Sequence, residues 1–193
     1  VMIIVFVASP KNWHFILMGV LGILMCVVFI ATAGYRADRI RIWLAPEKYD
    51  DGYQTMQSLY AIGSGGFFGR GLGNSIQKMG FIPESHNDMI FSVICEELGL
   101  FGAVLTIIMF ILLIYRCTVL AINSGDRFGG LIAVGVMAHI AVQVLINISV
   151  VTNTIPPTGV PLPFISYGGS SIFFLLLEMG LMFAVARQIK PGR

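Results

Sequence analysis

The sequence has few charged residues for its length. Only 11% of its 193 residues are Asp, Glu, Lys or Arg, whereas 56% are hydrophobic. With a mean hydropathy of +0.86, the chain is too apolar for an ordinary soluble domain, so we expect it in a bilayer. The net charge of +2 is too small and too scattered to indicate nucleic-acid binding.

Other familiar signals are also missing. Cys26, Cys95 and Cys117 have neither CxxC nor metal-ligand spacing, so they are expected to be small apolar residues. The glycine-rich stretch GSGGFFGRGLGN lacks the GK[ST] ending of a phosphate-binding loop, and a re-entrant or cavity-lining turn is the better interpretation. The chain opens inside an apolar run without a cleavable signal, and we expect a fragment whose earlier spans are missing.

The sequence contains long apolar runs, which predict an all-α polytopic membrane protein with about four complete spans. The expected spans are residues 15–34, 89–115, 128–151 and 170–187. Residues 35–88 form a large loop with short amphipathic helices, and residues 152–169 form a proline-rich loop without charge. Loop 152–169 has no Lys or Arg, whereas the 116–127 connection and the C-terminal tail carry basic residues, which predicts that the last two are cytoplasmic. Alternation of the spans then places residues 35–88 outside, although that long loop carries six basic residues.

Polar side chains recur at helical spacing in two of these runs. Asp88, Ser92 and Glu96 follow one another at i, i+4 and i+8, which places Glu96 roughly 12 Å along the helix from Asp88. Carboxylates at such depth are costly unless they face a wet cleft or a partner, so they are functional candidates. The alternative is a helix that extends above the bilayer with its carboxylates in water.

A second polar stripe lies in the 128–151 run. His139, Gln143 and Asn147 also fall at i, i+4 and i+8, where side chains either hydrogen-bond across a helical bundle or contact a substrate. Glu178, midway along the last run, is a pairing partner or a cavity residue. The sequence leaves both alternatives open.

Two blocks, QSLYAIGSGGFFGRGLGNSIQKMGFIPESHNDMIFSVICEELGLFG and PPTGVPLPFISYGGSS, closely resemble the SEDS family of membrane proteins (shape, elongation, division and sporulation; FtsW, RodA and SpoVE). The resemblance implies the C-terminal half of a roughly ten-helix fold in the bacterial plasma membrane. It implies a peptidoglycan glycosyltransferase that polymerises lipid II, with a class B penicillin-binding protein as partner and no activity in the isolated fragment. Members acting in cell division, elongation and sporulation all fit.

The resemblance also implies a catalytic residue. The family motif P-E-x-H-T-D-F falls on residues 83–89, which places its essential aspartate at Asp88. Asp88 is therefore the expected general base and the expected ligand of a divalent cation, Mg²⁺ or Mn²⁺. Asn87 and Met89 replace the usual Thr and Phe on either side, and both departures leave the carboxylate in place.

Further residues are expected to contact the substrate. Arg70 and Lys78 are candidates for the pyrophosphate, with ordinary interfacial behaviour as the alternative; Glu84 and His86 would shape the loop or contact sugar. Glu96 would face the cleft, and Ser170 and Ser171 belong to the SYGGSS signature at the mouth of the last span. The full set of expected substrate contacts is Arg70, Lys78, Glu84, His86, Glu96, Ser170 and Ser171.

Two other functions use the same features. A lipid II flippase or transporter would leave the lipid chemically unchanged, with the second polar stripe and Glu178 lining its pathway and Asp88 at the exit. A scaffold that only recruits a partner would tolerate substitution of Asp88.

Overall fold

A computed structural model describes residues 13–32, 34–77 and 86–189 of the chain. These residues form α-helices and short 3-10 turns, and no strand occurs among them, which confirms the all-α prediction. The elements are α2 (Trp13–Thr32), α3 (Gly34–Leu44), η1 (Pro46–Lys48), η2 (Asp50–Gly52), α4 (Tyr53–Gly65), α5 (Ile90–Ile122), α6 (Arg127–Val151) and α7 (Gly169–Gln188).

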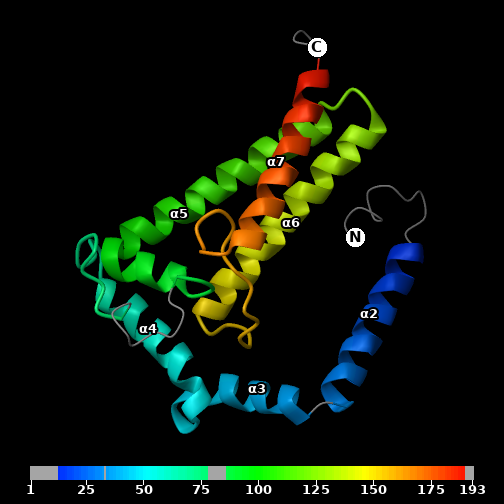
Figure 1. Ribbon diagram of the computed structural model, residues 1–193. Helices are drawn as coiled ribbons and strands as arrows, with labels where there is room; N and C mark the ends of the chain where they lie inside the picture. Colours follow the sequence, from blue (N-terminus) through cyan, green and yellow to red (C-terminus); the bar gives the residue numbers. More distant parts are fainter. Residues whose placement is uncertain (1–12, 33, 78–85, 190–193) are drawn as a thin grey trace.

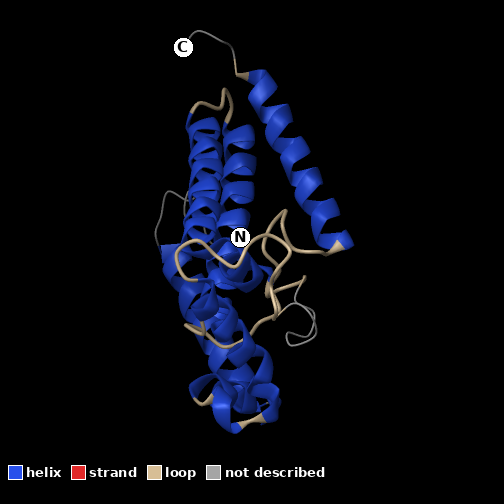
Figure 2. Cartoon of the chain, turned by 90° about the vertical axis from the view of Figure 1, so that its left-hand side faces the viewer, coloured by secondary structure: helices blue, strands red, loops and turns tan. Residues whose placement is uncertain are grey.

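Helices α5, α6 and α7 form the main bundle (Figure 1). Each is long and apolar enough to cross a membrane, and most of each helix faces outward rather than into the protein. A large apolar surface on all sides is what a bilayer requires of a spanning bundle. Figure 2 shows α7 inclined to the α5–α6 pair.

The helix bounds differ most from expectation in α5. Helices α6 and α7 occupy the ranges expected for spans at 128–151 and 170–187, whereas α5 continues to Ile122, beyond the expected end at residue 115. The extension contains no glycine or proline before Gly125, so nothing in its backbone chemistry stops the helix earlier. Crossing of a membrane at these bounds stays a prediction.

Helix α2 stands apart from the bundle (Figure 1). Among the described elements it contacts α3 alone, and apolar side chains such as Leu17, Leu21 and Ile23 are more than half exposed. Its segment Ile16–Met25 is a shorter apolar helix, so the first expected span, 15–34, stays a prediction.

The described part of the region 35–88 contains the helices α3 and α4 and the turns η1 and η2, while its assignment as an extracellular loop with amphipathic helices stays a prediction. Helix α3 runs across one end of the molecule to a corner made by η1 and η2, from which α4 returns toward α5 (Figure 1). On the way α3 is fastened to the loop between α6 and α7: Arg39 Nη1 donates to the carbonyl of Pro157 at 2.9 Å, and Trp43 Nε1 to that of Asn153 at 2.9 Å.

Candidate functional site

The two blocks of the sequence analysis meet at one end of the bundle. Residues 86–89 form a turn immediately before α5, and the 152–168 loop lies against them. The backbone N–H of Tyr167 donates to the carbonyl of His86 at 2.8 Å. Gly159, with φ of +68°, lies so close that a Cβ there would be 3.9 Å from Asp88 Oδ2. The Asp88 carboxylate therefore faces the turn of the proline-rich loop at Gly159.

Asn147 on α6 holds these two segments together. Its side chain is fully buried, and its Nδ2 donates to the Asp88 carbonyl at 2.7 Å and to the Val160 carbonyl at 2.8 Å. One turn away, Gln143 Nε2 donates to the Pro161 carbonyl at 3.0 Å. Asn147 thus binds the backbone of Asp88 and of the loop, and Gln143 binds the neighbouring loop backbone. Asp88 itself is only partly buried.

The third member of that stripe makes a different contact. His139 Nδ1 lies 2.9 Å from both carboxylate oxygens of Glu178 and joins α6 to α7. The His139 side chain is half exposed and that of Glu178 about a quarter exposed. One face of α6 therefore contacts α7 at His139 and the loop at Gln143 and Asn147.

Glu96 forms a separate buried cluster further along α5. Its carboxylate is completely buried and accepts hydrogen bonds from Arg70 Nη1 at 3.1 Å, Ser75 Oγ at 2.5 Å, and the backbone N–H groups of Ile76 at 3.1 Å and Gln77 at 3.3 Å. A buried carboxylate with a cation and three further donors is well satisfied. Glu96 anchors the glycine-rich loop to α5.

A break in α5 lets this loop reach its backbone. Gly99 has φ of +67° and ψ of −160° inside the helix, a conformation essentially restricted to glycine. Leu100 N donates to Gly66 O at 2.8 Å, and Phe101 N donates to Phe67 O at 3.3 Å. The loop thus supplies the acceptors that the broken helix lacks, as buried irregular backbone requires.

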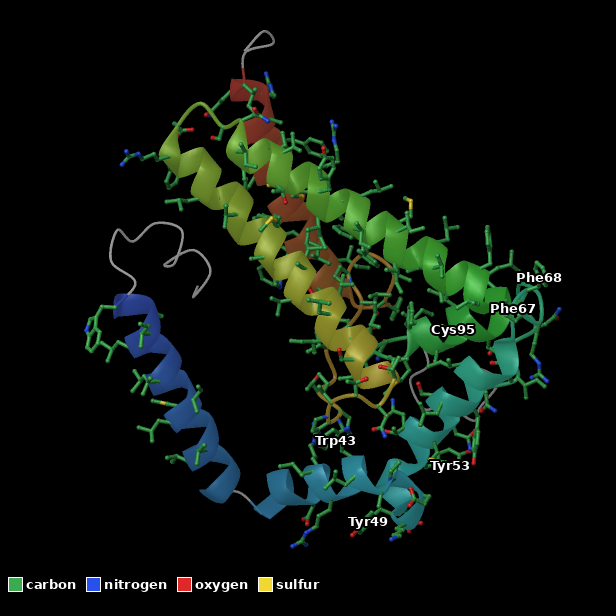
Figure 3. All side chains as sticks on the ribbon, turned by 180° about the vertical axis from the view of Figure 1, so that it is seen from behind. Trp43, Tyr49, Tyr53, Phe67, Phe68 and Cys95 are labelled. Carbon is green, nitrogen blue, oxygen red and sulfur yellow. The ribbon has the colours of Figure 1, made fainter. Side chains whose placement is uncertain are left out.

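A small apolar cavity borders this junction. It has a volume of about 270 Å³ and is lined by residues of α4, the loop and α5: Ile62, Gly63, Gly66, Phe67, Cys95, Gly99, Leu100 and Ala103. Phe67 and Phe68 lie at the start of the glycine-rich loop, just after α4 (Figure 3), and both are largely exposed. The glycine-rich stretch therefore lines a cavity, one of the two structures considered for it.

The expected substrate-contacting residues fall into three groups. Exposed His86 adjoins Asp88, and Ser170 and Ser171 lie in the first turn of α7, just after the Tyr167 that bonds His86. Arg70 and Glu96 contact each other about two helical turns along α5 from Asp88. Lys78 and Glu84 lie outside the described residues.

Sequence reasoning missed several contacts at this site. The 3.6-residue periodicity singled out Asn147, but it contained no sign that its partners are the Asp88 and Val160 carbonyls. The docking of Arg39 and Trp43 onto the loop was also missed, because the short helices expected in residues 35–88 carry no sign of a contact with the 152–169 loop. Contacts between residues so distant in sequence have no local signature.

The oxygen groups at this site suit a hard cation. The described residues contain no group of three or more His, Cys, Asp or Glu side chains that could hold a metal. Mg²⁺, however, is commonly held by one or two carboxylates together with substrate phosphates and water. The Gln143 and Asn147 side-chain oxygens are buried and accept no hydrogen bond from the described protein. A single carboxylate at Asp88 fits that mode.

Comparisons with known proteins match the chain to one group of related proteins. A family model described as cell cycle protein, for FtsW, RodA and SpoVE, matches residues 1–191. Stage V sporulation protein E of Bacillus subtilis is 43% identical over 96% of the chain and 51% of the relative. A probable peptidoglycan glycosyltransferase FtsW of Trichlorobacter lovleyi is 39% identical over 98% of the chain and 51% of the relative. The chain thus spans about half the length of these relatives.

Solved structures show the same likeness. A chain of a peptidoglycan synthase complex, described as coordinating polymerization and crosslinking, matches with a TM-score of 0.73 and 28% identity, covering 98% of this chain and 53% of that one. A mutant of the rod shape determining protein RodA of Thermus thermophilus matches with a TM-score of 0.54 and 32% identity, covering 70% of this chain and 41% of that one.

Proposed function

Because the chain belongs to the FtsW/RodA/SpoVE family of cell cycle proteins, we propose that it carries the catalytic carboxylate of a peptidoglycan glycosyltransferase. The substrate in this proposal is lipid II, the undecaprenyl-linked disaccharide-pentapeptide. One observation carries the assignment: Asp88 lies where the two family blocks meet, its backbone held by buried Asn147 and its carboxylate facing the loop at Gly159.

The reaction needs a base near the acceptor sugar. The acceptor 4-hydroxyl attacks the anomeric carbon of the donor; the new glycosidic C–O bond forms as the bond to the lipid pyrophosphate breaks. Asp88 accepts the hydroxyl proton, and the bond electrons leave with the pyrophosphate. A positioned general base of this kind accelerates proton transfer by about 10²–10⁴-fold. Fixing the Asp88 backbone through Asn147 serves the orientation that such a base requires.

The departing pyrophosphate needs positive charge or hydrogen-bond donors. The first turn of α7, with Ser170 and Ser171, has N–H groups without intrahelical acceptors and no side-chain cap, and it follows the Tyr167 that bonds His86, so it is a suitable place for an anion. A divalent cation such as Mg²⁺ or Mn²⁺, when bound, would supply further positive charge, and Asp88 is the carboxylate that would hold it. Lys78 and Glu84 remain part of the proposed substrate contacts.

The structure adds a constraint for the other two predicted contacts. Arg70 and Glu96 bond each other and the loop up to Gln77, so any contact that they make with substrate must be compatible with this network. Their mutual contact supports a role in holding the glycine-rich loop on α5.

We also propose that the protein works with a class B penicillin-binding protein in the plasma membrane. The support is the likeness to a chain from a peptidoglycan synthase complex and the three helices long and apolar enough to cross a membrane.

The test is glycan-strand formation from purified lipid II. The assay uses a protein of the relatives' full length that contains this chain, reconstituted with its penicillin-binding partner. Asp88→Asn should lower the polymerisation rate by about 10²–10⁴-fold, the contribution of a general base. Asp126→Asn is the matched control, because Asp126 is the N-cap of α6 and Asn caps equally well. Polymerisation by the Asp88→Asn protein at the native rate would show that Asp88 is not the general base.

A lipid II transporter is the second candidate, and one contact favours it. The His139–Glu178 pair joins two candidate spans, and ionisable groups at such positions often mark a transport pathway. Vesicles that contain the protein and fluorescent lipid II decide the matter: movement between leaflets without polymer, lost in Glu178→Gln, would favour transport.

A further inference from the structure

A second concave site lies at the corner between α3 and α4. It has a volume of about 530 Å³, and Figure 3 shows Tyr49 and Tyr53 at the α3–α4 corner. We call it the tyrosine pocket; its lining residues are Pro46, Glu47, Lys48, Tyr49, Asp50, Tyr53, Met56, Gln57 and Tyr60. Its volume is typical of sites for small molecules or short segments of a polymer.

The chemistry of the lining is specific. Tyr49, Tyr53 and Tyr60 are each about half exposed, and together they offer aromatic faces with hydroxyl groups at their edges. Glu47 and Asp50, both exposed, add carboxylate acceptors. Gln57 adds an amide that both donates and accepts. Aromatic faces cover the C–H face of a pyranose ring, while carboxylates and amides bond its hydroxyl groups.

The corner is also held in shape before anything binds. Pro46 is buried, and Gly52 approaches it so closely that a Cβ at Gly52 would overlap the Pro46 carbonyl. Backbone bonds from Lys48 N to Ala45 O at 3.1 Å and from Gly52 N to Tyr49 O at 3.0 Å close successive turns. A site held in shape by its own backbone loses less entropy when a ligand binds.

The pocket lies at the same end of the bundle as Asp88. Ser58 Oγ on α4 donates to the carbonyl of Val151, the last residue of α6, at 3.1 Å. Asn147, which holds Asp88, lies one turn earlier on the same helix. Figure 1 shows the α3–α4 corner at the opposite end of the molecule from the end of α7.

Two other occupants suit the lining less well. The phosphate of a lipid headgroup is anionic, and the pocket presents two carboxylates against one lysine, Lys48, so the charges oppose it. The central part of a protein–protein interface is depleted of charged residues, but the lining contains three of them, Glu47, Lys48 and Asp50.

We propose that the tyrosine pocket binds saccharide, namely the glycan strand at a distance from the reacting sugars. The proposal rests on the proposed polymerase function, since that function provides a strand on this side of the bundle. A strand held at the corner stays with the enzyme between additions, so the pocket determines how many sugars are added before release.

The test separates binding from chemistry. The full-length protein and a Tyr53→Ala/Tyr60→Ala variant are titrated with a peptide-free GlcNAc–MurNAc octasaccharide, and product strands from lipid II are sized on gels. The variant should bind the octasaccharide at least tenfold more weakly and release strands several-fold shorter, with the rate of forming the first glycosidic bond unchanged. Tyr53→Trp should retain binding, because it keeps an aromatic face. Tyr115→Ala is the control, an equally exposed tyrosine in α5.

Each outcome is decisive. Native octasaccharide affinity in the double variant overturns the proposal, whatever the polymer length. Native affinity and length together with lost stimulation by the penicillin-binding partner identify the pocket as a protein interface instead. Polymerisation absent from the native protein contradicts the proposed function, and in that case lost octasaccharide binding in the variant still supports a saccharide site.

Discussion

Asn147 uses both hydrogens of its side-chain amide on backbone carbonyls, and one of them belongs to Asp88. Carbonyl oxygens that lose their donor in a buried place cost about 1–3 kcal/mol each unless water replaces it. The amide therefore determines the position of the Asp88 backbone, and with it the direction of the carboxylate.

This contact gives a kinetic prediction. Asn147→Leu has the same number of side-chain heavy atoms and the same branching at Cγ but lacks both donors, so the Asp88 turn loses this anchor and can shift relative to Gly159. A shift of about 1 Å lowers a rate by up to about 100-fold, and we expect kcat for polymerisation to fall about 10- to 100-fold with little change in KM. Steady-state kinetics on lipid II measure the two constants separately.

Gln143→Leu is the matched control for that variant. Gln143 contacts the Pro161 carbonyl and not Asp88, so kcat should fall less. Equal losses in both variants, or a change in KM alone, would show that Asn147 supports the loop in general and does not position Asp88.

The sequence identified Asp88 as the candidate through its motif, and the periodicity of α6 identified the stripe that holds it. The contacts that this stripe makes could not be predicted, because a stripe that hydrogen-bonds to another element and a stripe that contacts substrate have the same spacing in sequence. Glu96 presents a different difficulty. A carboxylate that faces water and a carboxylate that anchors a loop have the same pattern in sequence, and only the four hydrogen-bond donors around Glu96 distinguish them.

Helix α5 was expected as one continuous run, and the break at Gly99 was not. Glycine is common in membrane helices, so its presence between two leucines indicates nothing unusual. At the break, the N–H groups of Leu100 and Phe101 donate to the carbonyls of Gly66 and Phe67 in the loop and not to carbonyls within α5. The pairing depends on the glycine-rich loop as much as on the helix.

Gly99→Ala should therefore disrupt this junction. A Cβ on Gly99 would overlap Gly69 N and Phe67 O, and the φ of +67° is itself unfavourable for alanine. We expect a destabilisation of about 1–3 kcal/mol from backbone conformation alone, with more from the overlap, measured as a lower midpoint of thermal unfolding in detergent. Gly180→Ala, in α7 with nothing within 4 Å, should leave the midpoint unchanged or raise it slightly. An unchanged midpoint in Gly99→Ala would mean that the loop and helix separate at no cost.

The orientation of the molecule follows from its charges, and labelling tests it. Loop 152–169 has neither Lys nor Arg, whereas connection 116–127 has Arg116 and Arg127, which predicts that the first is outside. A membrane-impermeant maleimide should label Thr158→Cys in intact cells and Asn123→Cys only after permeabilisation, since both positions are exposed.

The unsubstituted protein gives the background of that labelling, to which its own cysteines, Cys26, Cys95 and Cys117, can contribute; Cys95 and Cys117 are buried. Labelling of Asn123→Cys in intact cells would invert the orientation and place Asp88 on the cytoplasmic side, which would contradict the proposed function.

The positions of the three long apolar helices along the chain could be predicted from apolar runs, because length and hydrophobicity alone define a candidate span. The way in which the loops close over the end of the bundle could not be predicted. Contacts such as Trp43 with Asn153 and Ser58 with Val151 join segments that share no local pattern.

The contacts around Asp88 also fix an order of assembly. A ribosome makes Asp88 well before Asn147 and Val160, and the Asp88 turn has no amide to bind until α6 and the following loop have been synthesised. Gly66 and Phe67 likewise wait for Leu100 and Phe101. A nascent chain interrupted after α5 would contain the motif residue without the contacts that hold it, so the geometry around Asp88 forms only after α6 and the loop that follows it have been synthesised.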